Sequence, residues 1–315
     1  MSKIWLVGAG PMARDYMKVL ESLQVDYLTV GRGEKSALEC GAHTSKQVVI
    51  GGLGKFLATQ PTVPTHAIVA VPVQELYACA MGLIEYGVKE ILIEKPAGLN
   101  SQEVAQLNSA CKNNQVNLVL AYNRRFYASV EKAKQMILED GGASSCVFEF
   151  TEWSHVIEKL DKPEAVFQHW FLGNSTHVVD LAFHLIGKPK TLTSYVKGSV
   201  AWHKSGSIFV GSGESENGVL FSYHANWTAP GRWSVEVLTS KRRYIFKPME
   251  ELKVIALGTV REENVELDGS LDKEFKPGLY LETQRFLAGD CAQHCSIDDQ
   301  NQLMTDYYRM AGYDK

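Results

Sequence analysis

Short apolar runs alternate with amphipathic segments along the first 122 residues of the chain. The runs are rich in Val, Ile and Leu, as strands covered by helices on both faces are. Strands are predicted at residues 3–7, 26–30, 66–71, 90–93 and 117–121, with a weaker one at 47–50. Helices are predicted between them at residues 11–23, 74–86 and 101–113. This alternation is typical of βαβ units on a parallel sheet.

The pattern changes after residue 124, where a helix at 128–138 is followed by longer runs of alternating apolar and polar residues. Such runs are typical of antiparallel strands. They predict strands at residues 146–153, 191–197, 207–211, 219–227, 233–238 and 243–246. Further helices are predicted at 178–186, 279–287 and 298–310. The sequence thus predicts two domains, residues 1–123 and 124–315, with the last helix free to pack back on the first domain.

Composition agrees with two globular domains, because 315 residues of which 45% are hydrophobic can bury a substantial core. The net charge of -4 comes from 32 basic and 36 acidic residues mixed along the chain, so we expect no nucleic-acid partner and no membrane association. The first residues lack the pattern of a signal peptide. Six scattered cysteines suit reduced thiols. We therefore expect a cytoplasmic protein.

A glycine motif, Gly8-Ala9-Gly10-Pro11-Met12-Ala13, joins the first predicted strand to the first helix. In a G-x-G-x-x-A motif the first glycine permits a tight turn, the second lets the backbone approach a pyrophosphate, and the alanine allows close helix packing. Free N–H groups at the helix start bind the anion. The alternative is a chance glycine turn, but the strand-to-helix position favours a dinucleotide-binding Rossmann domain.

The end of the second predicted strand bears on the choice of cofactor. An acidic residue there binds the adenine ribose of NAD. This chain has Gly31-Arg32-Gly33 instead, and a guanidinium can pair with a 2′-phosphate. We therefore expect NADP in preference to NAD, with Gly31 and Arg32 in the binding site. The alternative is an ordinary solvated arginine.

Several further motifs resemble the Gfo/Idh/MocA oxidoreductases. They are the turns Ala70-Val71-Pro72 and Glu94-Lys95-Pro96, the junction Tyr122-Asn123-Arg124-Arg125-Phe126, and the closing Ser296-Ile297-Asp298-Asp299. The resemblance spans nearly the whole chain. It implies a doubly wound Rossmann domain followed by an α/β domain with an open, largely antiparallel sheet. It also implies cofactor contacts from Val71, Pro72, Glu94, Lys95, Asn123 and Arg124.

Lys95 and His177 are the expected catalytic residues. Lys95 follows the carboxyl end of a strand, where open α/β sheets bind ligands, and in the family it hydrogen-bonds the reacting hydroxyl of the substrate. His177 and Asp180 match the family's H-x-x-D pattern, and an imidazole can exchange the hydroxyl proton near neutral pH. The alternatives are a surface lysine and a buried structural histidine. Asp180, inside a predicted helix, is expected to orient structure.

The chain departs from the family pattern four residues before His177. Many members have an aspartate there, but this chain has Gly173 followed by Asn174, whose neutral amide can bind a hydroxyl and cannot act as a base. The second domain is also rich in aromatic and imidazole groups, which suit sugars. Trp153 and His155 are the expected substrate contacts, although core packing is the plainer explanation for most of the others. We expect no metal site.

These features predict an NAD(P)-dependent dehydrogenase or reductase that acts on a CH-OH group of a sugar, polyol or related small molecule. The alternative is a cofactor-binding sensor or regulatory protein of the same fold without turnover, because the usual aspartate is missing at Gly173. The open sheet of the second domain predicts a homodimer or homotetramer.

Overall fold

The computed structural model of the protein describes residues 4–44 and 46–314. The chain forms two compact units. Unit 1 contains Met1–Asn123 and Asp272–Gln302, and unit 2 contains Arg124–Leu271 and Leu303–Lys315. The sequence places all of residues 124–315 in the second domain, whereas Asp272–Gln302 groups with unit 1. The reason is pairing and packing, because β15 joins the sheet of unit 1 beside β6 and α11 packs on α1.

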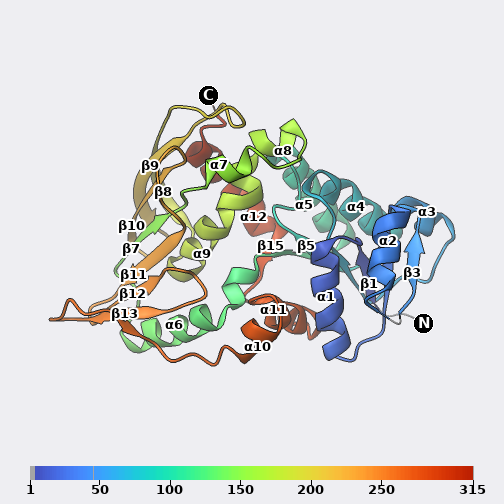
Figure 1. The fold of residues 1–315 in the computed structure, drawn as a ribbon, viewed down its shortest axis with the longest axis horizontal. Helices are drawn as coiled ribbons and strands as arrows, with labels where there is room; N and C mark the ends of the chain where they lie inside the picture. The colour runs from blue at the N-terminus through green and yellow to red at the C-terminus, as the bar shows by residue number, and fades with distance from the viewer. Residues whose placement is uncertain (1–3, 45, 315) are drawn as a thin grey trace. The chain divides into compact units, whose positions relative to one another are not determined.

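Unit 1 is built on a seven-stranded sheet in the order β15-β6-β5-β4-β1-β2-β3 (Figure 1). Its strands pair in parallel except for the antiparallel pair β15 and β6. This confirms the predicted doubly wound parallel sheet. Lys3, predicted in the first strand, lies outside the described residues. The strands are β1 Ile4–Val7, β2 Tyr27–Gly31, β3 Val48–Ile50, β4 His66–Val69, β5 Glu90–Glu94, β6 Asn117–Ala121 and β15 Cys295–Ser296.

The helices of unit 1 include four predicted ones and two others. Helices α2 and α3 were not predicted because each is short and begins beside glycine, a residue typical of turns. The helices are α1 Pro11–Ser22, α2 Glu34–Gly41, α3 Gly52–Ala58, α4 Val73–Tyr86, α5 Ser101–Asn114 and α11 Leu279–Leu287. Two further helices cross the boundary between the units, α10 Ser270–Glu274 and α12 Ile297–Ala311.

Unit 2 contains an eight-stranded sheet in the order β14-β13-β12-β11-β7-β10-β9-β8. Every neighbouring pair is antiparallel except β10 with β7, so the predicted largely antiparallel sheet is confirmed. The strands are β7 Ser145–Glu149, β8 Pro189–Lys197, β9 Ile208–Ser215, β10 Leu220–Asn226, β11 Ser234–Leu238, β12 Arg242–Phe246, β13 Lys253–Ala256 and β14 Glu263–Asn264.

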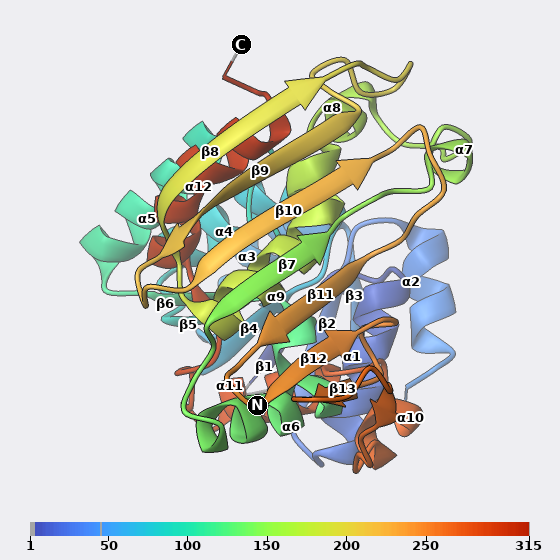
Figure 2. The same ribbon diagram turned by 90° about the vertical axis from the view of Figure 1, so that its left-hand side faces the viewer.

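The two faces of this sheet have different surroundings. Helix α9 (Thr176–Ile186) packs on the inner face, where the rings of Phe148 and Phe183 meet edge to face with their centroids 5.9 Å apart. The opposite face has no helix in front of it in Figure 2. There the side chains of Tyr195, Val210 and Leu220 are exposed. The inner side chains thus make the core of unit 2, and the outer face stays open.

The segment between β7 and α9 corrects one prediction. The strand expected at residues 146–153 ends at Glu149, and Trp153 is instead the N-cap of the short helix α7 (Ser154–Ile157). Helix α8 (Glu164–Gln168) and a π-helical turn (Phe171–Ser175) follow, and the turn runs directly into α9. The remaining helix of unit 2 is α6 (Ala128–Glu139). Within the described residues, none of the helices is long and apolar enough to cross a membrane.

A buried histidine makes the stability of unit 2 depend on pH. His203 is fully buried; its Nδ1 donates to the Gly206 carbonyl oxygen (2.8 Å), and its Nε2 accepts from the Tyr313 hydroxyl (3.0 Å). Burial lowers the pKa of His203 from 6.5 to about 4. The unfolded chain therefore binds a proton more readily than the folded chain between these two pH values.

We accordingly expect the free energy of unfolding to fall by up to about 3 kcal/mol, through this residue alone, as the pH drops from 6.5 to 4. Urea unfolding across this range, compared with His203→Gln, measures the effect. The variant should lose stability less steeply with falling pH than the wild type. Parallel pH profiles for the two proteins would contradict the assignment.

Candidate functional site

The turn between β1 and α1 in unit 1 admits only glycine at its first position. Gly8 has a φ of +129°, and a Cβ added there would lie 2.2 Å from the Ala70 carbonyl oxygen at the end of β4. The Gly8 N–H donates to the Val30 carbonyl oxygen of β2 (2.9 Å). The turn is therefore held between β2 and β4, where the strand order reverses and open α/β sheets bind ligands.

The backbone N–H groups at the start of α1 are available to bind a ligand. Gly10 is the N-cap of α1, no side chain caps the helix, and the first turn carries no acidic residue. A Cβ added at Gly10 would meet nothing within 4 Å, so the backbone faces open space, and Ala13 packs with no exposed surface. Backbone N–H groups and the helix dipole at such an end attract a phosphate. The residues present thus fit a dinucleotide pyrophosphate.

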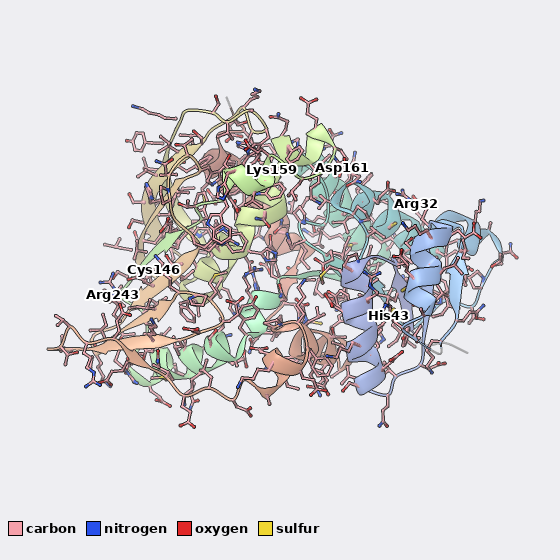
Figure 3. The ribbon with its side chains drawn as sticks, in the orientation of Figure 1. Arg32, His43, Cys146, Lys159, Asp161 and Arg243 are labelled. Carbon is pink, nitrogen blue, oxygen red and sulfur yellow. The ribbon has the colours of Figure 1, made fainter. Side chains whose placement is uncertain are left out.

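The structure places an acid beside Arg32 (Figure 3) that the sequence did not indicate. Arg32 follows β2 and is 70% exposed, and its Nη1 lies 2.7 Å from Oε1 of Glu75 in the first turn of α4. Pro72 is the N-cap of that helix. Gly31 is also constrained, since a Cβ there would lie 3.0 Å from the Ala9 Cβ. The guanidinium is therefore held near the dinucleotide turn by a carboxylate.

Lys95 follows the end of β5, next to a buried polar cluster. It is half-buried, as is Glu94, whose Oε1 accepts a hydrogen bond from the Tyr16 hydroxyl of α1 (3.3 Å). Desolvation raises the pKa of Glu94, while the charges of Lys95 and Lys276 oppose that rise. Burial, together with the charge of Glu94, raises the pKa of Tyr16 well above its usual value. Tyr16 therefore stays a neutral donor that fixes Glu94 beside Lys95.

Two residues of the Asp272–Gln302 segment reach the same part of unit 1. Lys276 Nζ lies 2.7 Å from Met12 Sδ and 3.8 Å from Asp15 Oδ2, both on α1. Asn123 Nδ2 donates to the Pro277 carbonyl oxygen (2.9 Å). Asn123 thus anchors this segment, and Lys276 adds a positive charge near the motif helix that local sequence patterns did not reveal.

His177 lies in the first turn of α9, directly after the π-helical turn that holds Gly173 and Asn174. Such turns are frequent at functional sites. The half-buried His177 ring lies with its centroid 6.2 Å from that of Trp233. Asp180, one turn on, forms a buried bidentate ion pair with Arg125, with bonds of 2.6 and 2.8 Å. Asp180 therefore orients structure, as its place in the helix indicates.

Glu152 is a buried carboxylate that the sequence reasoning missed. Its side chain is 1% exposed, and its Oε1 accepts from Asn174 Nδ2 (2.9 Å) and Ser175 Oγ (2.8 Å). Its Oε2 lies 3.6 Å from Arg232 Nη1. Burial raises the pKa of Glu152, and these partners oppose the rise. A carboxylate from the segment after β7 therefore lies beside Asn174, although Gly173 supplies none.

Aromatic rings lie beside Glu152 in unit 2. The Trp153 side chain is 48% exposed, its Nε1 donates to the Gly231 carbonyl oxygen (3.0 Å), and its ring centroid lies 6.4 Å from that of the exposed His155. A cavity of about 530 Å³ adjoins both rings. It is lined by Glu152, Trp153, Ser154, His155, Glu158, Trp227, Thr228, Ala229, Pro230 and Gly231. The two expected substrate contacts therefore share one pocket.

Among the other aromatic and imidazole groups of unit 2, Trp227 lines the same cavity, whereas His224 and His184 do not. His224 is exposed on a strand whose neighbours Tyr223 and Ala225 point inward, so it lies on the open face. Trp227 is 1% exposed and stacks on Trp202, with ring centroids 5.3 Å apart. His184 is packed against Lys134, and burial lowers its pKa well below the usual value. Core packing explains Trp227 and His184, and His224 is an exposed residue of the open face.

Comparison with known proteins gives the fold. No family model and no curated protein matches the chain. A levoglucosan dehydrogenase in complex with NADH and L-sorbose is 17% identical, with a TM-score of 0.79 over 99% of this chain and 97% of that one. A putative NADPH-dependent oxidoreductase from Desulfitobacterium hafniense is 15% identical, with a TM-score of 0.80 over 98% and 94%.

A UDP-N-acetylglucosamine 3-dehydrogenase from Acidithiobacillus ferrooxidans is 16% identical, with a TM-score of 0.72 over 98% of this chain and 95% of that one. These structures span nearly the whole chain at low identity. The chain therefore has the two-domain fold found in these three structures, in agreement with the fold that the sequence motifs imply.

Proposed function

We propose that the protein is an NAD(P)-dependent oxidoreductase of the Gfo/Idh/MocA type that acts on a hydroxyl or carbonyl group of a sugar, polyol or related small molecule. The observation that carries the proposal is the turn from Gly8 to Gly10. It approaches the β4 backbone so closely that only glycine fits at residue 8, and it leaves the start of α1 open to a pyrophosphate. When bound, the nicotinamide would supply the hydride acceptor or donor.

The protein residues handle the proton of the reacting hydroxyl. We assign Lys95 and His177 to this task, because hydride loss from a carbinol carbon is favourable only when a base takes the hydroxyl proton, and both side chains offer a basic nitrogen. Asn174 is assigned to substrate binding. Its amide nitrogen is engaged by Glu152, which leaves its carbonyl oxygen as the group to accept a hydrogen bond from a sugar hydroxyl.

The sugar-like substrate class is supported by the exposed indole of Trp153 beside a cavity, and by the dehydrogenases of similar fold whose names specify sugars. A sensor without turnover was the alternative because Gly173 lacks a carboxylate. Glu152 now supplies a carboxylate next to Asn174, which favours the enzyme. The test is absorbance of the reduced nicotinamide while NADP or NAD and a panel of sugars and polyols are added. Cofactor binding without turnover across the panel would favour the sensor.

Arg32 is proposed to set the preference for NADP through the 2′-phosphate. We expect Arg32→Ala to weaken NADP binding about 10-fold or more, and NAD binding much less, because a charge-assisted pair is lost only with NADP. Glu75→Gln is the informative companion, since it releases Arg32 from its carboxylate partner and should strengthen NADP binding. Fluorescence titration of both cofactors gives the affinities. Equal losses for NADP and NAD in Arg32→Ala would remove the assignment.

The open face of the unit 2 sheet is proposed to bind a second copy of the chain. Tyr195, Val210 and Leu220 are 68%, 43% and 62% exposed on adjacent strands. Exposed apolar groups that cluster in this way mark interfaces. Sedimentation at micromolar concentration should show a dimer or tetramer that Val210→Lys dissociates. A wild-type species of only 35.0 kDa would contradict this prediction.

A further inference from the structure

Two arginines and two tryptophans form a layered cluster in unit 2. The Arg232 guanidinium lies over two indoles, 4.8 Å from the Trp153 ring centroid and 4.4 Å from that of Trp233. Arg124 also lies over Trp233, 4.8 Å from its ring centroid. Aromatic faces attract guanidinium groups and hold their planes in place. The cluster thus presents two fixed guanidinium groups, and His177 lies against the same Trp233 ring.

Within the described residues, no carboxylate lies at hydrogen-bond distance from either guanidinium group of this cluster. Glu152 is the carboxylate nearest to Arg232. The distance of 3.6 Å between Glu152 Oε2 and Arg232 Nη1 is longer than a normal hydrogen bond. Glu152 Oε1 already accepts hydrogen bonds from Asn174 and Ser175. Within the described part of the chain, Arg124 has no carboxylate at ion-pair distance, and its buried Nε has no hydrogen-bond partner. The two guanidinium groups therefore interact with Glu152 and Glu250 only over distances longer than a hydrogen bond.

Burial makes the positive charge of Arg124 costly. Burial lowers the pKa of Arg124, and the nearby positive charge of Arg232 acts in the same direction, against the carboxylates of Glu250 and Glu152. A guanidinium group stays charged in proteins, so it does not reduce the cost of burial by losing its proton. A bound anion reduces that cost instead. The planar donors of arginine match carboxylate and phosphate oxygens.

We propose that the substrate carries an anionic group, a carboxylate or a phosphate, which binds to Arg124 and Arg232 beside Trp233. The inference rests on the proposed function and narrows its substrate class to acidic sugars, either uronic acids or sugars linked to phosphate. Because His177 contacts the same indole, the anionic group lies close to the reacting carbon. Neutral sugars would leave the two guanidinium groups without their partner.

Calorimetric titration tests the proposal directly. The wild-type protein, with and without NADP, is titrated with glucose and galactose, with glucuronate and galacturonate, and with glucose 1-phosphate and UDP-glucose. We expect the anionic ligands to bind at least about 10-fold more tightly than the neutral sugars. Tighter binding of the uronates identifies a carboxylate, and tighter binding of the phosphorylated sugars identifies a phosphate. Equal binding of neutral and anionic sugars would overturn the proposal.

Matched variants test whether the preference for anionic ligands depends on Arg124 and Arg232. Arg232→Gln and Arg124→Gln should each reduce anion binding about 10-fold or more. Arg243→Gln is the control, because Arg243 (Figure 3) is an exposed arginine of unit 2 that pairs with Glu236. Arg232→Lys keeps the charge and loses the planar fork, so it should bind anions with intermediate affinity. Anion binding that survives both Gln variants would contradict the assignment.

The ligand titrations and the turnover assay distinguish the anionic-substrate proposal from the proposed oxidoreductase activity. Turnover of neutral sugars with no preference for charged ones would leave the oxidoreductase proposal intact and reject the anionic substrate. Tight binding of acidic sugars without any change in nicotinamide absorbance would reject catalysis and retain the anion site. If a Gln variant fails to fold, as judged by circular dichroism, the wild-type ligand comparison still decides.

Discussion

Lys95→Ala and His177→Ala are each expected to lower turnover by roughly 10²-fold or more while cofactor affinity stays nearly unchanged. The reason is that the hydroxyl proton must leave as the hydride does, and each residue offers a nitrogen for that proton. Steady-state kinetics of both variants, with cofactor binding measured separately, is the test.

Two controls separate catalysis from general damage. Lys89→Ala removes an exposed lysine from the segment before β5, and His224→Ala removes an exposed histidine from the open face of the unit 2 sheet. Both controls should keep near-normal turnover. If Lys95 and His177 serve the same proton, the double variant should be little worse than either single one, because residues that act together are not additive. Near-normal turnover in His177→Ala would contradict its role.

Gly8→Ala is expected to destabilise unit 1 by about 3 kcal/mol or more and to abolish cofactor binding. The added Cβ would lie 2.2 Å from the Ala70 carbonyl oxygen, and the φ of +129° disfavours any side chain. Gly10→Ala provides the contrast. Its Cβ would meet nothing within 4 Å, so stability should change little, yet the methyl group occupies the space needed by the pyrophosphate.

Urea unfolding and cofactor titration of the two glycine variants measure these effects. Loss of cofactor binding without loss of stability in Gly10→Ala would locate the pyrophosphate at the start of α1. Retention of binding in Gly10→Ala, or normal stability in Gly8→Ala, would contradict the assigned roles of this turn.

The fold followed from the hydrophobic pattern because that pattern records which faces are buried. Strand β6 was predicted with its observed bounds, Asn117–Ala121, since both of its faces are buried and the run is continuous. Short elements were not predicted. Helix α3 begins at the second of two successive glycines in the left-handed region, where the sequence signals a turn, and β15 is only two residues long. The pairing of β15 with β6 joins residues that lie far apart in sequence.

The candidate site likewise contains some residues that the sequence predicts and others that it does not. Gly8 and Lys95 could be proposed from the sequence because each belongs to a local motif whose neighbouring residues contribute to the same function. Glu75, Glu152 and Arg232 were missed because their partners are distant in sequence. Glu152 contacts Asn174 and Arg232 only because the end of β7, the π-helical turn and the segment before β11 meet in the folded chain. No regular spacing in the sequence predicts contacts between residues of this kind.

Transfer of deuterium tests the oxidoreductase proposal most directly. The protein is mixed with reduced cofactor deuterated at C4 of the nicotinamide and with the carbonyl form of the sugar that the panel identifies. Mass spectrometry should find the deuterium on the carbinol carbon of the product, and Lys95→Ala should transfer it roughly 10²-fold more slowly. Cofactor that binds normally and keeps all of its deuterium in the presence of acidic and neutral sugars would contradict the account.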